Sequence, residues 1–149
     1  MSNETNSRTL TFALEVVPVP VTDIDRAISF YTTKVGFDLD VDYHPTADFR
    51  VVQLTPRGSK CSIHLLATKS SERLHNLYLV TSDLSEARAE LINRGVAMGD
   101  ARHKDVLEAW SGGWSPGLDP ERRDYASFAD FADPDGNTWT LQERGHGKP

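Results

Sequence analysis

The side chain with the most chemical potential in this sequence is His64, in the segment KCSIHLLA at residues 60–67. An imidazole changes protonation near neutral pH, so it can serve as a general acid, a general base or a hydrogen-bond donor. Ser62 lies two residues earlier and would share the same face of a strand. No nucleophile motif accompanies His64, so the sequence does not support nucleophilic catalysis. A strand histidine held by a hydrogen-bond partner is the other interpretation, and both stay open.

Two tryptophans, Trp110 and Trp114, lie in residues 101–124, a segment without regular patterning. A connection longer than ~12–15 residues is usually functional or disordered, and tryptophans are costly to leave exposed in a disordered one. We therefore expect a lid that packs over a cleft, where either tryptophan can stack on a planar ligand. Anchoring of the loop to the body or to a second subunit is the alternative. Arg122 and Arg123 stand beside two acidic residues, and such surface arginines are usually solvated.

The first half of the chain has the pattern of a strand, a helix and three further strands. Residues 11–21 are apolar and β-branched, which favours a strand, and Pro18 and Pro20 mark an edge or an end. Thr22 or Asp23 can cap the helix that follows. Alternating segments then predict strands at residues 37–43, 49–55 and 60–67.

The second half repeats this order, and the repeat of roughly sixty residues is the strongest organisational signal in the sequence. The sequence VTDI at residues 21–24 is matched by TSDL at residues 81–84, and each precedes a helical pattern. The sequence DPDG at residues 133–136 suits a type I turn, because Asp caps it, Pro fixes φ and Gly takes positive φ. The predicted elements are strands at 75–80 and 96–101, a helix at 81–95, and a hairpin of residues 125–132 and 137–143.

These patterns predict a single α+β domain over residues 10–144. Module one would cover residues 10–68 and module two residues 74–144, with the long loop at about 101–124. Residues 1–9 and 145–149 are polar or small, and we expect mobile ends there.

The composition is that of a globular protein, with 38% hydrophobic and 26% charged residues. No apolar run approaches ~18 residues and the N-terminus lacks an apolar core, so neither a transmembrane helix nor a secretory signal is expected. The net charge of −6 disfavours nucleic acid and anionic membranes as partners. The one cysteine, Cys61, cannot form an internal disulfide, which favours a cytoplasmic protein.

Two tandem βαβββ units, with VTD opening the first helix, FYTTKVGF closing it and DPDGN before the last strand, resemble the vicinal oxygen chelate superfamily. That superfamily includes glyoxalase I, extradiol dioxygenases, methylmalonyl-CoA epimerase and the bleomycin and fosfomycin resistance proteins. The resemblance covers residues 11–143. It implies a glyoxalase-like fold, in which two tandem βαβββ modules form a curled mixed sheet around one cleft. One fold hosts many chemistries, so the resemblance does not identify a reaction.

In the metal-dependent members of that superfamily, four residues on four strands chelate a divalent ion in the cleft. The resemblance places these positions at Val16, His64, Asn76 and Thr140. A transition-metal site normally needs at least three His, carboxylate or thiolate donors, and this set holds one imidazole. We therefore expect a degenerate metal site and no cofactor.

The resemblance also implies that Asn76, Tyr78 and Thr140 line the same cleft as His64. Amide, phenol and hydroxyl groups are what a small-molecule pocket uses to orient its ligand. The predicted ligand-binding residues are Val16, Ser62, His64, Asn76, Tyr78, Trp110, Trp114 and Thr140. The leading hypothesis is a metal-independent protein that binds a small planar or aromatic organic molecule.

Two enzymatic alternatives stay open at this point. One is a lyase, isomerase or dioxygenase that holds a divalent metal through His64 and atypical donors. The other is a metal-free enzyme that uses His64 as acid and base. We also expect a homodimer, because superfamily members pair their modules within a chain or across two chains, and the edge strand must be covered.

Overall fold

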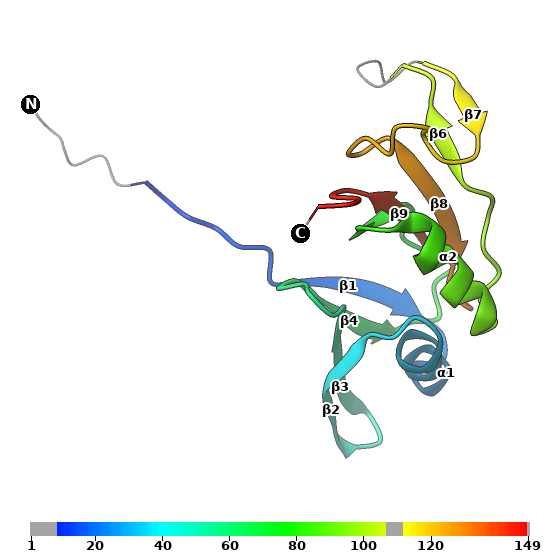
Figure 1. The fold of residues 1–149 in the computed structure, drawn as a ribbon. Coiled ribbons are helices and arrows are strands. Elements are labelled where there is room, and N and C mark those ends of the chain that lie inside the picture. The colour runs from blue at the N-terminus through cyan, green and yellow to red at the C-terminus, as the bar shows by residue number, and fades with distance from the viewer. Residues whose placement is uncertain (1–8, 107–111, 149) are drawn as a thin grey trace, which may run out of the picture.

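The computed structural model describes residues 9–106 and 112–148, and its strands lie in two sheets (Figure 1). The first module forms a four-stranded sheet in the order β1-β4-β3-β2, in which β1 and β4 run parallel. Its elements are β1 (Val16–Val21), α1 (Ile24–Ser29), η1 (Phe30–Lys34), β2 (Asp38–Thr46), β3 (Phe49–Thr55) and β4 (Ser62–Ala67). This is the βαβββ order that the sequence predicts.

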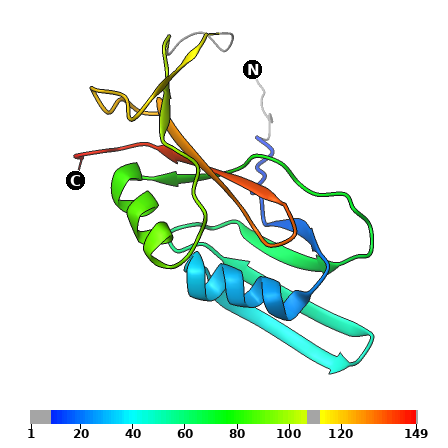
Figure 2. The same cartoon turned by 90° about the vertical axis from the view of Figure 1, so that its right-hand side faces the viewer.

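The second module forms a five-stranded sheet in the order β5-β9-β8-β6-β7, and β5 and β9 run parallel as β1 and β4 do. Its elements are β5 (Leu77–Thr81), α2 (Leu84–Asn93), β6 (Arg102–Lys104), β7 (Trp114–Pro116), β8 (Ser127–Ala132) and β9 (Thr138–Glu143). Figure 2 shows the two sheets and their helices from the side. The α+β class with two modules is confirmed, and the second module has one strand, β7, beyond the predicted βαβββ order.

Equivalent residues begin the helices of the two modules. The Asp23 carboxylate accepts a hydrogen bond from the Arg26 backbone N–H at 3.0 Å, and Asp83 accepts one from Glu86 at 2.9 Å. Each aspartate therefore satisfies an N–H group that the first helical turn leaves without a partner. The predicted caps are confirmed, with Asp23 rather than Thr22 as the first.

The two modules are joined by a buried aromatic cluster of Phe30, Tyr31, Phe37, Phe131 and Trp139. The Tyr31 hydroxyl donates to the Asp133 carboxylate at 2.7 Å and accepts from the Trp139 indole N–H at 2.9 Å. Burial, and then the nearby Asp133 charge, raise the pKa of the Tyr31 hydroxyl well above its usual range. Trp139 is a core residue, since it is 3% exposed.

The DPDGN turn fastens module two to the start of the helix in module one. Asp133 accepts hydrogen bonds from the backbone N–H groups of Asp135 and Asn137, which closes the turn. Asp135 accepts from the Thr22 N–H at 3.1 Å, and the Asn137 amide donates to the Pro20 carbonyl at 2.8 Å. The motif is therefore a contact between modules as well as a turn.

Two predicted strand boundaries are wrong. The first strand begins at Val16 rather than at residue 11, because its partner strand begins at Ser62 and Val16 is the residue opposite it. Residues 96–101 are not a strand, and within them only Gly99 bonds the neighbouring strand, through its N–H to Asp130. The second strand of module two is β6, which is paired with β8 through Arg102 and His103.

The segment 101–124 is not a loop throughout, because β6 and β7 within it pair as an antiparallel hairpin at the edge of the second sheet. Trp114 begins β7 and packs edge-to-face on Phe128 of β8, with ring centroids 5.1 Å apart. Trp110 lies outside the described residues. Among those described, no helix is both long and apolar enough to cross a bilayer.

Candidate functional site

The first sheet brings together three of the predicted site residues, Val16, Ser62 and His64. Ser62 and His64 alternate along β4 with the buried core residues Ile63 and Leu65, so they lie on the face turned away from the core. Val16 is the register partner of Ser62 on β1. This face of the first sheet is one half of the candidate site.

A chain of hydrogen bonds crosses this face beside His64. The Gln53 amide donates to the Ser62 hydroxyl at 3.3 Å, and the Thr55 and Ser62 hydroxyls are 2.6 Å apart. Thr55 also bonds the Asp40 carboxylate. The His64 side chain is half-buried and forms no hydrogen bond or ion pair with any other residue in the part of the chain that the structure describes. Its imidazole is therefore available to a ligand, which a histidine satisfied within the fold would not be.

The second sheet carries Tyr78 and Thr140, which are opposite each other on β5 and β9. Thr140 is buried, and its hydroxyl donates to the Asp130 carboxylate at 2.8 Å. Asp130 in turn accepts from the Arg102 guanidinium at 2.9 Å. The Thr140 hydroxyl is thus engaged within the sheet, and Tyr78 is the member of this pair that faces solvent.

Aromatic side chains cover the same side of the second sheet. Phe128 lies edge-to-face with Trp114, at 5.1 Å, and with Tyr78, at 6.4 Å between centroids. The Arg102 guanidinium carbon lies 4.8 Å from the centre of the Trp114 ring, within cation–π distance. Tyr78 and Trp114 are each about half exposed, whereas Phe128 is buried between them. We call Tyr78, Arg102, Trp114 and Phe128 the aromatic face.

Asn76 precedes β5 and has a φ of 60°, in the left-handed region that asparagine tolerates better than most residues. Its backbone N–H donates to the Thr138 hydroxyl at 2.7 Å. Asn76 is exposed at the end of the strand rather than within it. Its conformation is that of a turn residue.

Two of the four positions that would hold a divalent metal offer no free side-chain donor. Val16 has no donor atom, and the Thr140 hydroxyl is bonded to Asp130. His64 and Thr140 belong to different sheets. Within residues 9–106 and 112–148, no group of three or more His, Cys, Asp or Glu side chains could hold a metal ion.

Sequence reasoning missed Arg102, Phe128 and Asp130. The register of the hairpin around the DPDG turn could have identified two of them, because it places Asp130 opposite Thr140 and Phe128 opposite Gln142. Strand alternation would then have put both β8 side chains on the Thr140 side of the sheet. Arg102 follows from its pairing with Phe128, which joins elements that sequence patterns do not relate.

The two adjacent arginines of the 101–124 segment are engaged in ion pairs rather than solvated. Arg123 pairs with the buried Asp119 at 2.9 Å, and Arg122 pairs with the fully buried Glu143 at 2.5 Å. Burial alone would raise the pKa of Glu143, but hydrogen bonds from Arg122 and from the Leu84 N–H outweigh it and lower that pKa. The Arg122–Glu143 pair fixes the segment to β9, whereas the Arg123–Asp119 pair lies within the segment. Both arginines are therefore engaged by carboxylates of the protein itself.

The fold defines a class of protein built from two modules, each with a helix and a sheet. In this chain the first sheet carries polar side chains on its face away from the core, and the second sheet carries aromatic ones. The chain belongs to the Glyoxalase/Bleomycin resistance protein/Dioxygenase superfamily, whose family model matches residues 13–141.

Three relatives illustrate this membership. The chain is similar in structure to TnmS3, an antibiotic binding protein from Streptomyces sp. CB03234, with 29% identity, a TM-score of 0.67, and 91% of this chain and 98% of that one covered. A glyoxalase/bleomycin resistance protein from the same organism shows 30% identity and a TM-score of 0.64, with 88% and 100% covered. An uncharacterized protein from Shewanella frigidimarina is 30% identical over 134 residues, which cover 89% of this chain and 94% of that protein.

Proposed function

We propose that this protein binds a small planar aromatic molecule on its aromatic face, without a metal. The observation that carries the proposal is the pair of half-exposed rings, Tyr78 and Trp114, held by the buried Phe128 ring between them. Exposed aromatic side chains fixed by their neighbours can stack on a ligand with little loss of conformational entropy. The antibiotic-binding description of TnmS3 supports the binding of a small molecule.

Arg102 would orient the ligand on this face. Its guanidinium is held by two hydrogen bonds to Asp130, at 2.9 and 3.4 Å, and lies over the Trp114 ring. The Asp130 carboxylate neutralises the positive charge of Arg102. The guanidinium therefore offers a ligand a fixed planar surface rather than a net positive charge. A ligand with a flat ring system and few charges fits this arrangement.

We include a homodimer and a cytoplasmic location in the proposal. Tyr43 on the first sheet and Tyr78 and Trp114 on the second are large apolar side chains about half exposed in a single chain. Clusters of exposed apolar residues mark contact or ligand surfaces. The sequence has a single cysteine and so no internal disulfide, which supports a location in a reducing compartment such as the cytoplasm.

Binding is tested by titrating the protein with planar polycyclic antibiotics and with non-aromatic antibiotics of similar mass. We expect tryptophan fluorescence to change only with the planar compounds, and the change to be lost in a Trp114→Phe variant. Trp114→Ala should bind about twofold to tenfold more weakly, since an aromatic pair contributes about 0.5–1.5 kcal/mol. Phe49→Ala, at an exposed ring of the first sheet, is the matched control. Equal affinities for all three proteins would refute the assignment of this face.

A second candidate function rests on His64. Its imidazole has no partner in the described structure and lies beside the Gln53–Ser62 hydrogen bond, an arrangement that suits metal-free acid–base catalysis. An enzyme would convert a bound compound at a rate that falls in a His64→Gln variant with unchanged affinity. Stoichiometric recovery of the unaltered compound would exclude this candidate for that compound.

A further inference from the structure

A groove of about 470 Å³ lies between α2 and the first module. It is lined by η1 and the β3–β4 turn in the first module, and by β5, α2 and β9 in the second. Its volume lies within the range of roughly 300–1,000 Å³ that small-molecule pockets occupy. Among the described residues that line it, none belongs to the aromatic face and none is His64. The groove is therefore separate from the site described above.

The floor of the groove is apolar and is formed by the edge of the core. Phe37 of the first module and Leu91 and Leu141 of the second line it, and all three are buried core residues. Leu79 and Val80 extend this surface along β5, where Val80 is about half exposed. Covering such a surface with a hydrocarbon chain releases water and is favourable. The floor therefore suits the apolar part of a ligand.

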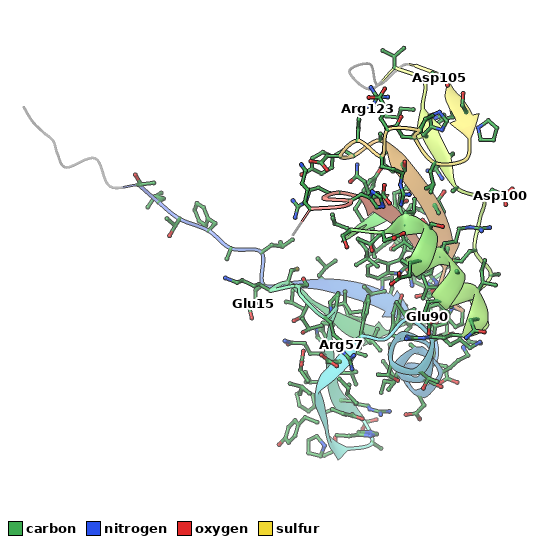
Figure 3. All side chains as sticks on the ribbon, viewed as in Figure 1. Glu15, Arg57, Glu90, Asp100, Asp105 and Arg123 are labelled. Carbon is green, nitrogen blue, oxygen red and sulfur yellow. The ribbon has the colours of Figure 1, made fainter. Side chains whose placement is uncertain are left out.

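Arg57 borders the groove from the β3–β4 turn and offers unused hydrogen-bond donors (Figure 3). Its Nε donates to Asp38, which does not line the groove, at 3.2 Å, and the Arg57 side chain is 80% exposed. Among the described residues, no group bonds its two terminal amino groups. A guanidinium with both of these groups available can donate two parallel hydrogen bonds to one carboxylate.

The charges on the rim favour an anion over a cation. Among the described lining residues, Glu90 on α2 is the one acid, and its carboxylate accepts from Arg94 Nε at 2.9 Å. Arg94 also donates from Nη1 to the Lys34 carbonyl at 3.4 Å, which holds it beside the first module. The two arginines outnumber the one glutamate, although the net charge of the whole chain is −6. A negatively charged group would be attracted to this rim.

We propose that this groove binds a small amphipathic carboxylate, namely an unbranched monocarboxylate of medium chain length. The carboxylate accepts hydrogen bonds from the terminal amino groups of Arg57, and the hydrocarbon chain lies along Val80 and Leu79 towards Phe37. Both modules line the groove, so an occupant bound there stabilises the folded arrangement of the two. This second site is independent of the aromatic face and of the function proposed for it.

Calorimetric titration of the full chain with decanoate, below its micelle concentration, tests the chemistry of the site. We expect decanol and decylamine, which share its hydrocarbon chain, to bind at least threefold more weakly than decanoate. An Arg57→Gln variant should bind decanoate about threefold to tenfold more weakly, because it loses a charge-assisted contact that solvent partly screens. Arg88→Gln, on α2 but outside the groove, is the matched control and should bind as the wild-type protein does.

Three results of these titrations would overturn the proposal. They are no binding of decanoate by the wild-type protein, equal affinity of the wild-type and Arg57→Gln proteins, and tighter binding of decylamine than of decanoate. The last result would show that Glu90, rather than the arginines, determines the preferred charge.

NMR spectra of the nitrogen-15-labelled chain test where decanoate binds. We expect the backbone amide signals of Gly36, Leu79 and Leu91 to shift on titration, and the indole signal of Trp114 to stay in place. Shifts at Trp114 without shifts at the groove residues would refute binding in the groove. A failure of planar compounds to bind, with the decanoate results as expected, would count against the proposed function alone.

Discussion

Replacing Arg122 with alanine should destabilise the protein more than any change at a surface ion pair. Arg122 donates to both Glu143 carboxylate oxygens, at 2.7 and 2.5 Å, and one of these oxygens also accepts from the Leu84 N–H at 2.8 Å. Glu143 is fully buried. In the Arg122→Ala variant, the carboxylate would stay in the core with one donor in place of three.

The magnitude follows from the burial of the two partners. Breaking a buried pair by removing one partner costs about 3–5 kcal/mol. The Arg122 side chain is 24% exposed, so water partly screens the pair and we expect the low end of that range. A domain of this size loses about 2–4 °C in melting temperature per kcal/mol, so about 3 kcal/mol corresponds to roughly 6–12 °C.

The effect should also depend on pH. In the wild-type protein the pKa of Glu143 is lowered, so its contribution to stability is present above the unfolded-state pKa of about 4.3 and lost as pH falls through the folded value. Without Arg122, burial dominates and raises the pKa of Glu143. At low pH, protonation of Glu143 then removes the buried negative charge from the variant, so the substitution costs less stability. The stability difference between the two proteins should therefore shrink from pH 7 to pH 4.

Denaturant unfolding of both proteins at pH 7 and pH 4 measures this difference. Arg57→Ala is the control, because Arg57 forms an ion pair with Asp38 in which both side chains are mostly exposed, worth under about 1 kcal/mol. If Arg122→Ala costs no more stability than the control at pH 7, the Arg122–Glu143 pair does not stabilise the fold as a buried pair. If the cost at pH 4 matches the cost at pH 7, the Glu143 charge is not its cause.

Three further outcomes follow from the described contacts. Tyr31→Phe should lower the free energy of unfolding by about 1–3 kcal/mol, because it leaves the buried Trp139 N–H without its acceptor; urea titration measures it. Elemental analysis after incubation with Zn²⁺, Ni²⁺ or Fe²⁺ should find no stoichiometric metal, and one ion per chain that is lost in His64→Ala would contradict this. Gly36→Ala should lower the melting temperature, because φ is 90° and the added Cβ would lie 2.9 Å from Arg94.

Much of the fold could be predicted because its signals are local. The helix caps Asp23 and Asp83, the type I turn at residues 133–136 and the alternation along β3 each depend on a few neighbouring residues. The repeat of these signals in two halves then predicts two modules. Strand ends were less predictable, since Val16 begins β1 only because β4 begins at Ser62, the register partner of Val16.

The candidate site could be predicted only in part. His64 and Tyr78 stand out by residue type within clear strand patterns, and alternation assigns their faces. Arg102 and Trp114 lie in an irregular sequence, and their place beside Phe128 depends on the pairing of β6 with β7 and β8. Such pairing joins residues far apart in the chain, and no local pattern specifies it.

The DPDGN turn shows why a motif that identifies a family can carry no information about its chemistry. Asp133 bonds Tyr31 and closes the turn, while Asp135 bonds Thr22, just before the helix of module one, and Asn137 bonds Pro20 of β1. Each of these side chains is therefore engaged in holding the two modules together. A protein can change its ligand without touching this turn, and it cannot change the turn without loosening the fold. Differences in function must then lie on the open sheet faces, where Trp114 is half exposed and the His64 side chain has no partner among the described residues.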